Sequence, residues 1–135
     1  MHWGHDVGPE MTPLEAGLGL TIDWSKDFIG KQALLKQRDE GVRKRLVLMQ
    51  IEGDALMLHD EPIFEGDTHV GLTTSGALGP RTGLNLAFGI VSVSPGESRD
   101  GTCQRQFSVR VAGQDYRAEP LRYPPFDPKG ERMRR

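Results

Sequence analysis

The spacing of apolar residues changes near position 43 from a helical to an extended pattern. Within 26–40, apolar residues recur at intervals of about 3.6 positions, which predicts a short amphipathic helix. Asp27 can cap the first amide groups of this helix, and Gly41 can adopt the left-handed conformation that commonly ends a helix. The preceding segment 1–25 has no sustained period, so we expect irregular structure there.

Beyond position 43 the pattern is that of strands. The segment 45–51 is apolar on both faces, which is typical of a central strand. In 106–111, apolar and polar residues alternate, and Gly113-Gln114 then forms a hairpin turn into the next strand. Glu65-Gly66-Asp67 marks a second hairpin. The strand candidates are 45–51, 62–64, 69–74, 86–93, 106–111 and 114–121.

The distribution of turn residues agrees with a small β-barrel. Seventeen glycines and nine prolines are spread along the chain rather than clustered, as expected for short strands joined by tight turns. A chain of 135 residues fits one domain with its own core. The prolines after position 121 lack the amide donors that a strand needs, so the barrel should end there.

Charge and cysteine content exclude several functional classes. A net charge of −2 gives no uniform basic field for nucleic acid, and no apolar run approaches the roughly 18 residues of a membrane span. The single cysteine, Cys103, cannot form an internal disulfide, and no signal segment opens the chain. These features favour a cytoplasmic protein, and the first residues read like a chain cut within a domain.

Candidate metal and nucleophile motifs remain incomplete. The run His2-x-x-His5-Asp6 holds residue types that zinc accepts, but a zinc site needs three or four ligands. Packing and hydrogen bonding by the two histidines are the favoured interpretation, and 59–61 is interpreted as a solvated turn. We therefore predict no metal site. Cys103 has no assignable base, which favours a structural cysteine.

The glycine-rich and hydroxyl-rich segment 73–83 resembles a phosphate loop only superficially. It lacks the lysine and the following helix of a Walker motif, and Ser75 lies outside any hydrolase elbow. A long barrel loop lining a partner surface is the better interpretation. The residues alone therefore define a small β-barrel with an N-terminal appendage and no catalytic residue.

Three linked motifs resemble the glycine-cleavage T-protein (aminomethyltransferase) family in order and spacing: 2–6 (HWGHD), 12–18 (TPLEAGL) and 27–34 (DFIGKQAL). The similarity continues through 45–47, 70–76 and 86–91, which look like strands of that family's C-terminal barrel. The opening motif and the ending 125–132 (PFDPKGER) look more like the sarcosine and dimethylglycine dehydrogenase branch. The resemblance spans nearly the whole chain.

This resemblance implies a fold and a reaction. The fold class would be mainly β, a six-stranded Greek-key barrel preceded by a short α/β segment with one helix. Residues 1–42 would end the folate-binding domain, 43–123 would form the barrel, and 124–135 would be a tail. The family captures a one-carbon unit as 5,10-methylenetetrahydrofolate, which implies tetrahydrofolate as cosubstrate. In the dehydrogenase branch FAD performs the oxidation, and it would sit on a separate upstream domain.

Few functional residues of the family fall within this chain. Lys26 lies where relatives carry a basic folate contact, and it could pair with the glutamyl carboxylate or simply be a solvated lysine. Trp3 and Asp6 follow the position of an acidic folate contact; Trp3 could pack beside the pterin or in the core. Glu15 is also a candidate structural residue. The family's acidic catalytic residue lies upstream, so this chain should not turn over substrate alone.

Two functional hypotheses follow. In the first, the chain is the C-terminal portion of a folate-dependent aminomethyltransferase or demethylating dehydrogenase and supplies one wall of the folate site. In the second, it is a non-catalytic β-barrel module that engages a protein partner. The first predicts an exposed apolar patch around Trp3, Leu14, Leu18 and Trp24, against which upstream folate or flavin domains would pack. The second predicts that these residues are covered or are paired in a homodimer.

Overall fold

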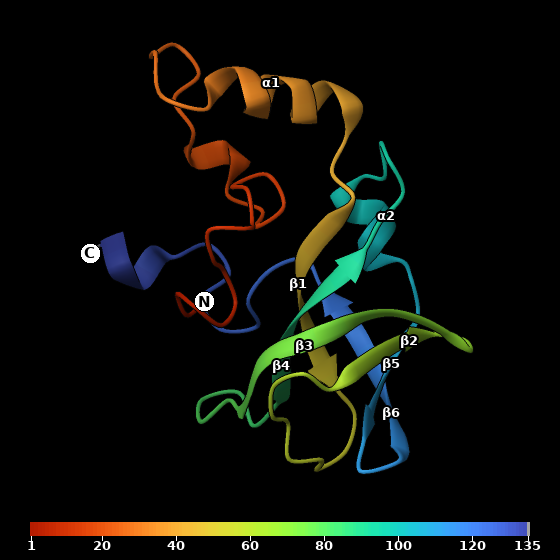
Figure 1. The fold of residues 1–135 in the computed structure, drawn as a ribbon. Coiled ribbons are helices and arrows are strands. Elements are labelled where there is room, and N and C mark those ends of the chain that lie inside the picture. Colours follow the sequence, from red (N-terminus) through yellow and green to blue (C-terminus); the bar gives the residue numbers. More distant parts are fainter. Residues whose placement is uncertain (135) are drawn as a thin grey trace.

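A computed structural model describes residues 1–134 and, within them, every side chain except that of Met133. Figure 1 shows a barrel of strands, with the helix of the N-terminal segment above it and the first residues of the chain beside it. The elements, in chain order, are η1 (Gly19–Thr21), α1 (Lys31–Glu40), β1 (Lys44–Ile51), β2 (Pro62–Glu65), β3 (Thr68–Leu78), β4 (Asn85–Ser92), α2 (Arg99–Cys103), β5 (Phe107–Val111), β6 (Gln114–Leu121) and η2 (Glu131–Arg134).

The six strands close into an antiparallel barrel in the order β1-β4-β3-β2-β5-β6. Strands β2, β3 and β4 are successive neighbours in the barrel. β4 then pairs with β1, the strand that precedes β2 in the chain, and this arrangement of four strands is a Greek key. β1 pairs with β4 from Lys44↔Ser92 to Ile51↔Asn85 and also pairs with β6. The predicted fold class and the central position of this strand are confirmed.

Both predicted hairpins are present, although the turn between β5 and β6 consists of Ala112-Gly113, one residue earlier than the predicted Gly113-Gln114. β5 and β6 meet at the pair Val111↔Gln114, and the two turn residues Ala112 and Gly113 have φ angles of 49° and 83°. Two successive positive φ angles are the signature of a type I′ turn, whose twist matches that of the strands. β2 and β3 meet at Glu65↔Thr68 around Gly66, which has a φ of 58°.

The core fills the inside of the barrel. Alternate residues of β4 are buried, as the period of a strand requires. Fully enclosed apolar side chains come from four different strands, and burying each one contributes about 1.5–3 kcal/mol to folding. They are Met49, Ile63, Val91 and Val109.

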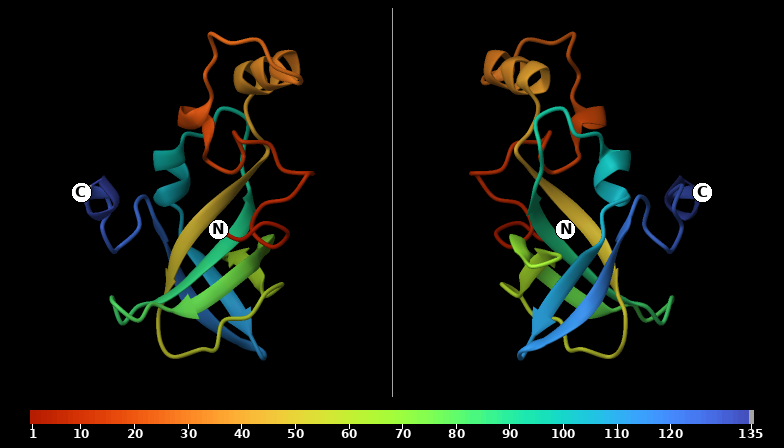
Figure 2. Two further views of the ribbon diagram at one scale, coloured as in Figure 1. Left: turned by 90° about the vertical axis from the view of Figure 1, so that its left-hand side faces the viewer. Right: turned by 90° about the vertical axis from the view of Figure 1, so that its right-hand side faces the viewer.

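The predicted helix is shorter than expected. α1 begins at Lys31 rather than at residue 26, because Gly30 takes a left-handed conformation (φ 88°) and breaks the run. Asp27 therefore does not cap it, and no side chain caps its first turn. α1 buries none of its residues, and Figures 1 and 2 show it standing away from the barrel. The N-terminal segment is thus packed far less than the barrel.

Two further differences concern the barrel itself. β3 continues to Leu78, so the first half of the predicted loop 73–83 is strand. The helix α2 was not predicted; Ser98 caps it by accepting a hydrogen bond from the amide of Gly101 at 2.9 Å. Among residues 1–134, no helix is long and apolar enough to cross a membrane. The domain limits at 42 and 123 stay predictions.

Candidate functional site

Trp3 and Asp6 lie in one tight turn formed by residues 2–7. The carbonyl of His2 accepts hydrogen bonds from the amides of His5 (3.3 Å) and Asp6 (2.9 Å). Gly4, with a φ of 90°, donates its amide to the carbonyl of Val7 at 2.8 Å. Only glycine adopts this φ without strain, so the sequence His-Trp-Gly-His-Asp encodes the turn directly.

Asp6 fixes this turn to the barrel. Its side chain is 2% exposed, and its Oδ1 accepts hydrogen bonds of 2.6 Å from the hydroxyls of Thr74 and Ser75 on β3. Its Oδ2 accepts the amide of His2 at 2.5 Å. Burial by itself raises the pKa of Asp6, but the hydrogen bonds from Ser75, Thr74 and His2 together outweigh burial and lower that pKa below its ordinary value. Asp6 is therefore a buried, ionised anchor.

Trp3 and Lys26 are, by contrast, exposed. The indole of Trp3 has 71% of its surface open to solvent. The ammonium group of Lys26 is 76% exposed and lies 3.5 Å from the carboxylate of Asp23. The structure brings Trp3 and Asp6 into one turn, while no hydrogen bond or ion pair among residues 1–134 joins Lys26 to either of them.

Glu15 ties the N-terminal segment together. The hydroxyl of Thr12 accepts the amide of Glu15 at 3.3 Å, and the carboxylate of Glu15 accepts the amide of Thr12 at 2.8 Å, which is a capping box. Gln37 of α1 donates to the same carboxylate at 3.3 Å, and the amide of Leu46 in β1 donates to the carbonyl of Glu15 at 3.0 Å. These contacts give Glu15 a structural position between the helix and the barrel.

A recess of about 400 Å³ lies beside the turn that Asp6 anchors. The rings of His2 and His5 meet edge to face at a centroid distance of 4.8 Å, and the ring of His59 lies 6.3 Å from that of His5. His59 belongs to the connection between β1 and β2, and its Nδ1 is 2.8 Å from the carboxylate of Asp60. The lining consists of His2, His5, Met57, Leu58, His59, Thr74, Ser75 and Gly76.

Sequence reasoning did not place His59 in this recess. The residues 59–61 carry no local signal beyond their polarity. Thr73 positions the segment: its carbonyl accepts the amide of Asp60 at 2.8 Å, and its hydroxyl accepts the amide of Glu61 at 2.9 Å. Thr73 is completely buried in β3, directly before the two residues that bind Asp6. One stretch of β3 thus holds both sides of the recess.

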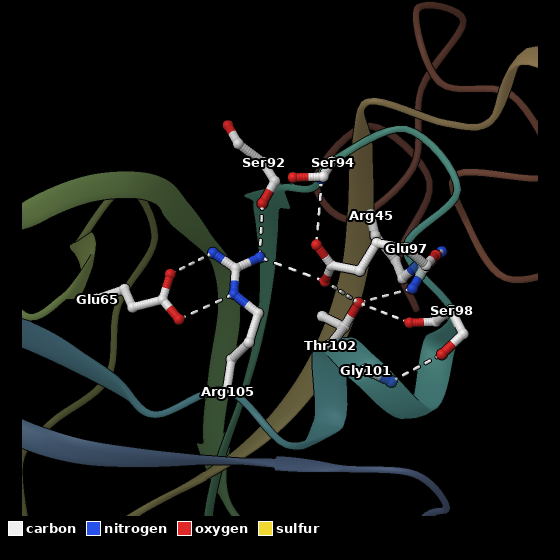
Figure 3. A network of polar contacts seen from close by, with 9 residues as sticks. All are labelled: Arg45, Glu65, Ser92, Ser94, Glu97, Ser98, Gly101, Thr102 and Arg105. Atoms are coloured by element: carbon white, nitrogen blue, oxygen red, sulfur yellow. Dashed lines mark hydrogen bonds and ion pairs between the residues drawn. The ribbon is translucent and has the colours of Figure 1, made fainter.

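The other polar cluster of the barrel lies beside α2 (Figure 3). The hydroxyl of Thr102, which is 1% exposed, accepts a hydrogen bond from Arg45 at 2.6 Å and donates to Glu97 at 2.7 Å. Arg105 makes two hydrogen bonds to Glu65, of 3.1 and 2.7 Å, and lies 3.5 Å from Glu97. The cluster links β1, β2 and α2.

The charges of this cluster are matched within it. Burial by itself raises the pKa of Glu97, but the hydrogen bonds from Thr102 and the amide of Ser94, together with Arg105, lower it overall. The hydrogen bonds to Glu65 raise the pKa of Arg105. No buried side-chain polar atom among the described residues lacks a partner. Because every group is satisfied, the cluster is a structural clamp, and Cys103 lies half-buried at the end of α2 next to it.

The fold defines the class of protein. The structure superposes on the crystal structure of glycine cleavage system aminomethyltransferase T from Bartonella henselae with a TM-score of 0.76, covering 89% of this chain and 33% of that chain at 20% sequence identity. Residues 44–127 match the family of the glycine cleavage T-protein C-terminal barrel domain. The chain therefore belongs to this family.

Two relatives of the chain carry different names. An aminomethyltransferase from Thermosynechococcus vestitus is 43% identical over 90 residues, covering 66% of this chain and 25% of the relative. A 4-methylaminobutanoate oxidase (formaldehyde-forming) from Paenarthrobacter nicotinovorans is 39% identical over 136 residues, covering 98% of this chain and 16% of the relative. The chain thus spans a quarter or less of the length of these relatives.

Proposed function

We propose that this chain is the C-terminal portion of a tetrahydrofolate-dependent aminomethyltransferase-like enzyme, of the T-protein or the sarcosine and dimethylglycine dehydrogenase type. It helps to form the folate site for one-carbon transfer to 5,10-methylenetetrahydrofolate. The observation that carries this proposal is the extent of the similarity to the oxidase, which covers 98% of the chain. It includes the segment 1–42, outside the matched barrel, which holds Trp3 and Lys26.

The chain's own residues would bind the cosubstrate rather than react with it. The exposed indole of Trp3 offers a flat apolar surface against which a pterin ring can stack. The exposed ammonium of Lys26 can exchange Asp23 for the glutamyl carboxylate of the folate. Asp6 would contribute by holding the Trp3 turn against β3. The acidic catalytic group and any FAD would come from upstream domains.

Titration with tetrahydrofolate, followed by tryptophan fluorescence, tests this proposal. Lys26→Ala should weaken saturable binding by about fivefold, which corresponds to about 1 kcal/mol for an exposed ion pair. Lys36→Ala is the matched control, because Lys36 is 73% exposed and also pairs with one carboxylate, that of Glu40. Trp3→Phe should weaken binding while Trp24 remains as the fluorescent reporter.

Equal affinities in all variants would contradict the assigned roles of Trp3 and Lys26. A folded chain without any tetrahydrofolate binding would contradict a preformed wall in this chain. That outcome would favour the second candidate, a non-catalytic barrel module that engages a protein partner.

Exposed apolar side chains in the N-terminal segment suit both candidates, either as a surface for upstream domains or as a surface for a protein partner. Leu20 and Ile29 are fully exposed, and Trp3 is 71% exposed. Leu14, Leu18 and Trp24, which were also expected in an apolar patch, are half-buried. Such residues would pack against upstream folate or flavin domains or against a second copy.

Sedimentation velocity over a range of concentrations distinguishes packing against upstream domains from packing against a second copy of the chain. Self-association that is lost in the double variant Leu20→Ser/Ile29→Ser would identify a second copy as the partner. A chain that stays monomeric at all concentrations would favour packing against other domains. Ala33→Ser, an exposed position on α1, is the control for a general effect of added hydroxyl groups.

A further inference from the structure

Exposed leucines gather at the end of the barrel that lies away from α1 (Figures 1 and 2). Leu56, on the connection between β1 and β2, is 76% exposed, and Leu78, the last residue of β3, is 68% exposed. Both side chains line one recess of about 450 Å³. The neighbours of Leu56, Ala55 and Met57, are buried, so the connection is fixed to the barrel while Leu56 faces solvent.

A second recess, of about 340 Å³, adjoins Leu78 on the outer face of the barrel. Its floor comes from β1 and β4, where Leu48 lies opposite Phe88, and Leu86 lies two residues before Phe88. These three side chains are only half-buried. The outer face of an antiparallel sheet is normally polar where water covers it. An apolar recess beside exposed leucines is therefore typical of a surface that another protein covers.

The charges around this surface are of opposite sign and are unpaired. Asp54 precedes Leu56 by two residues, and Arg81 follows Leu78 by three residues in the turn between β3 and β4. Both are exposed, and the ion pairs within residues 1–134 include neither of them. The guanidinium of Arg81 lies 4.9 Å from the ring centre of Phe126, a contact that leaves its charge unneutralised.

Projecting leucines, an apolar recess and one charge of each sign thus lie on the same surface. A twofold axis brings such a surface against its own copy, so that each feature of one chain meets its complement on the other. A partner with another surface would have to supply all three complements separately. The occupant that the charge pattern favours is therefore a second copy of this chain.

We propose that this end of the barrel is the interface of a twofold-symmetric homodimer. Leu56 of each copy enters the recess over Leu48 and Phe88 of the other, and Asp54 of each copy pairs with Arg81 of the other. The interface is distinct from the N-terminal segment with Leu20 and Ile29. It does not depend on folate binding, so the failure of either proposal leaves the other intact.

Sedimentation velocity over a range of concentrations tests the dimer. We expect a Kd on the order of 100 µM, as for small transient interfaces, so the chain is monomeric in dilute solution. Leu56→Ser should raise the Kd at least about tenfold, because the change removes one apolar contact from each half of the dimer. Leu20→Ser is the matched control, since Leu20 is a fully exposed leucine of the N-terminal segment. Circular dichroism of each variant checks the fold.

A charge exchange tests the geometry of the dimer. Asp54→Arg and Arg81→Glu should each weaken self-association about tenfold, because each variant places like charges opposite one another twice. An equimolar mixture of these two variants should recover the affinity of the native chain, since both contacts of the mixed dimer then join opposite charges. Asp67→Arg, in the exposed turn before β3 and thus at the far end of that strand, is the control.

Three results would overturn the proposal. A chain that stays monomeric at the highest soluble concentration would indicate that another domain covers this surface. A dimer that survives Leu56→Ser, or that is lost equally in Leu20→Ser, would place the interface elsewhere. A mixture of the two charge variants that associates no better than either variant alone would exclude the pairing of Asp54 with Arg81.

Discussion

The carboxylate of Asp6 accepts a 2.6 Å hydrogen bond from the hydroxyl of Thr74, a residue 68 positions further along the chain. This contact joins the N-terminal segment to β3 at the point where the pairing of β3 with β4 shifts register, between Thr73 and Ser75. A bulge of this kind turns side chains out of the regular alternation. Consecutive hydroxyls of Thr74 and Ser75 can therefore both reach Asp6.

Asp6→Asn tests how much this anchor stabilises the chain. The amide oxygen of asparagine can still accept from Thr74 or Ser75, but its NH₂ group would face the amide of His2, which is also a donor. We expect a loss of about 1–3 kcal/mol in the free energy of unfolding, because a buried donor loses its acceptor. Urea unfolding monitored by circular dichroism measures it. Asp54→Asn, at an exposed position, is the control and should change stability by less than about 0.5 kcal/mol.

The lowered pKa of Asp6 predicts how this difference depends on pH. In the unfolded chain the carboxyl titrates near 3.9, whereas in the folded chain its pKa is lower. The folded state therefore favours the ionised form, so the contribution is complete above about pH 5 and is lost as pH falls through the folded pKa. The stability difference between the native chain and Asp6→Asn should be constant from pH 5 to 7 and shrink below pH 4. A difference that grows on acidification would refute an ionised anchor.

Much of the barrel could be predicted from local pattern. The alternation in β5 and Gly113 reveal the hairpin from the sequence alone, although the predicted turn Gly113-Gln114 lies one residue later than the observed turn Ala112-Gly113. The start of α1 could not be predicted in this way. The periodic pattern of apolar residues extends across Gly30, but the left-handed conformation of Gly30 means that the helix begins only after it. The helix α2 had a signal in Ser98 and Asp100, a cap and an acidic first turn, but the segment is too short to show a period.

The candidate site was less accessible to sequence reasoning than the fold. Trp3 and Asp6 share a motif and lie in one turn, but only the structure shows that Asp6 is buried while Trp3 is exposed. The approach of His59 to His5 depends on the path of the connection between β1 and β2 and on Thr73, which holds it. Contacts between residues so far apart in the sequence form when the barrel closes, and the spacing of neighbouring residues does not predict them.

Thr102→Val tests how much the polar cluster beside α2 contributes to the free energy of unfolding. Valine has the shape of threonine without the hydroxyl, so the change removes one hydrogen bond each from Arg45 and Glu97 and leaves both groups partly buried. We expect a loss of about 2–3 kcal/mol in the free energy of unfolding, because bonds to charged groups exceed neutral ones. Thr68→Val, at an exposed position of β3, is the control in the same urea series. Equal stability of the two variants would show that Arg45 and Glu97 are satisfied without Thr102.

The hairpin between β5 and β6 offers a stabilising change. Ala112 has a φ of 49°, a conformation that costs alanine about 1 kcal/mol and that asparagine and glycine adopt more readily. Ala112→Asn creates Asn-Gly, the preferred pair of a type I′ turn, and should raise the free energy of unfolding by about 0.5–1 kcal/mol. Ala112→Val, with a β-branched side chain at the same φ, should lower it by at least as much. Thermal unfolding of the two variants measures both changes, and the opposite order of melting temperatures would contradict the turn type.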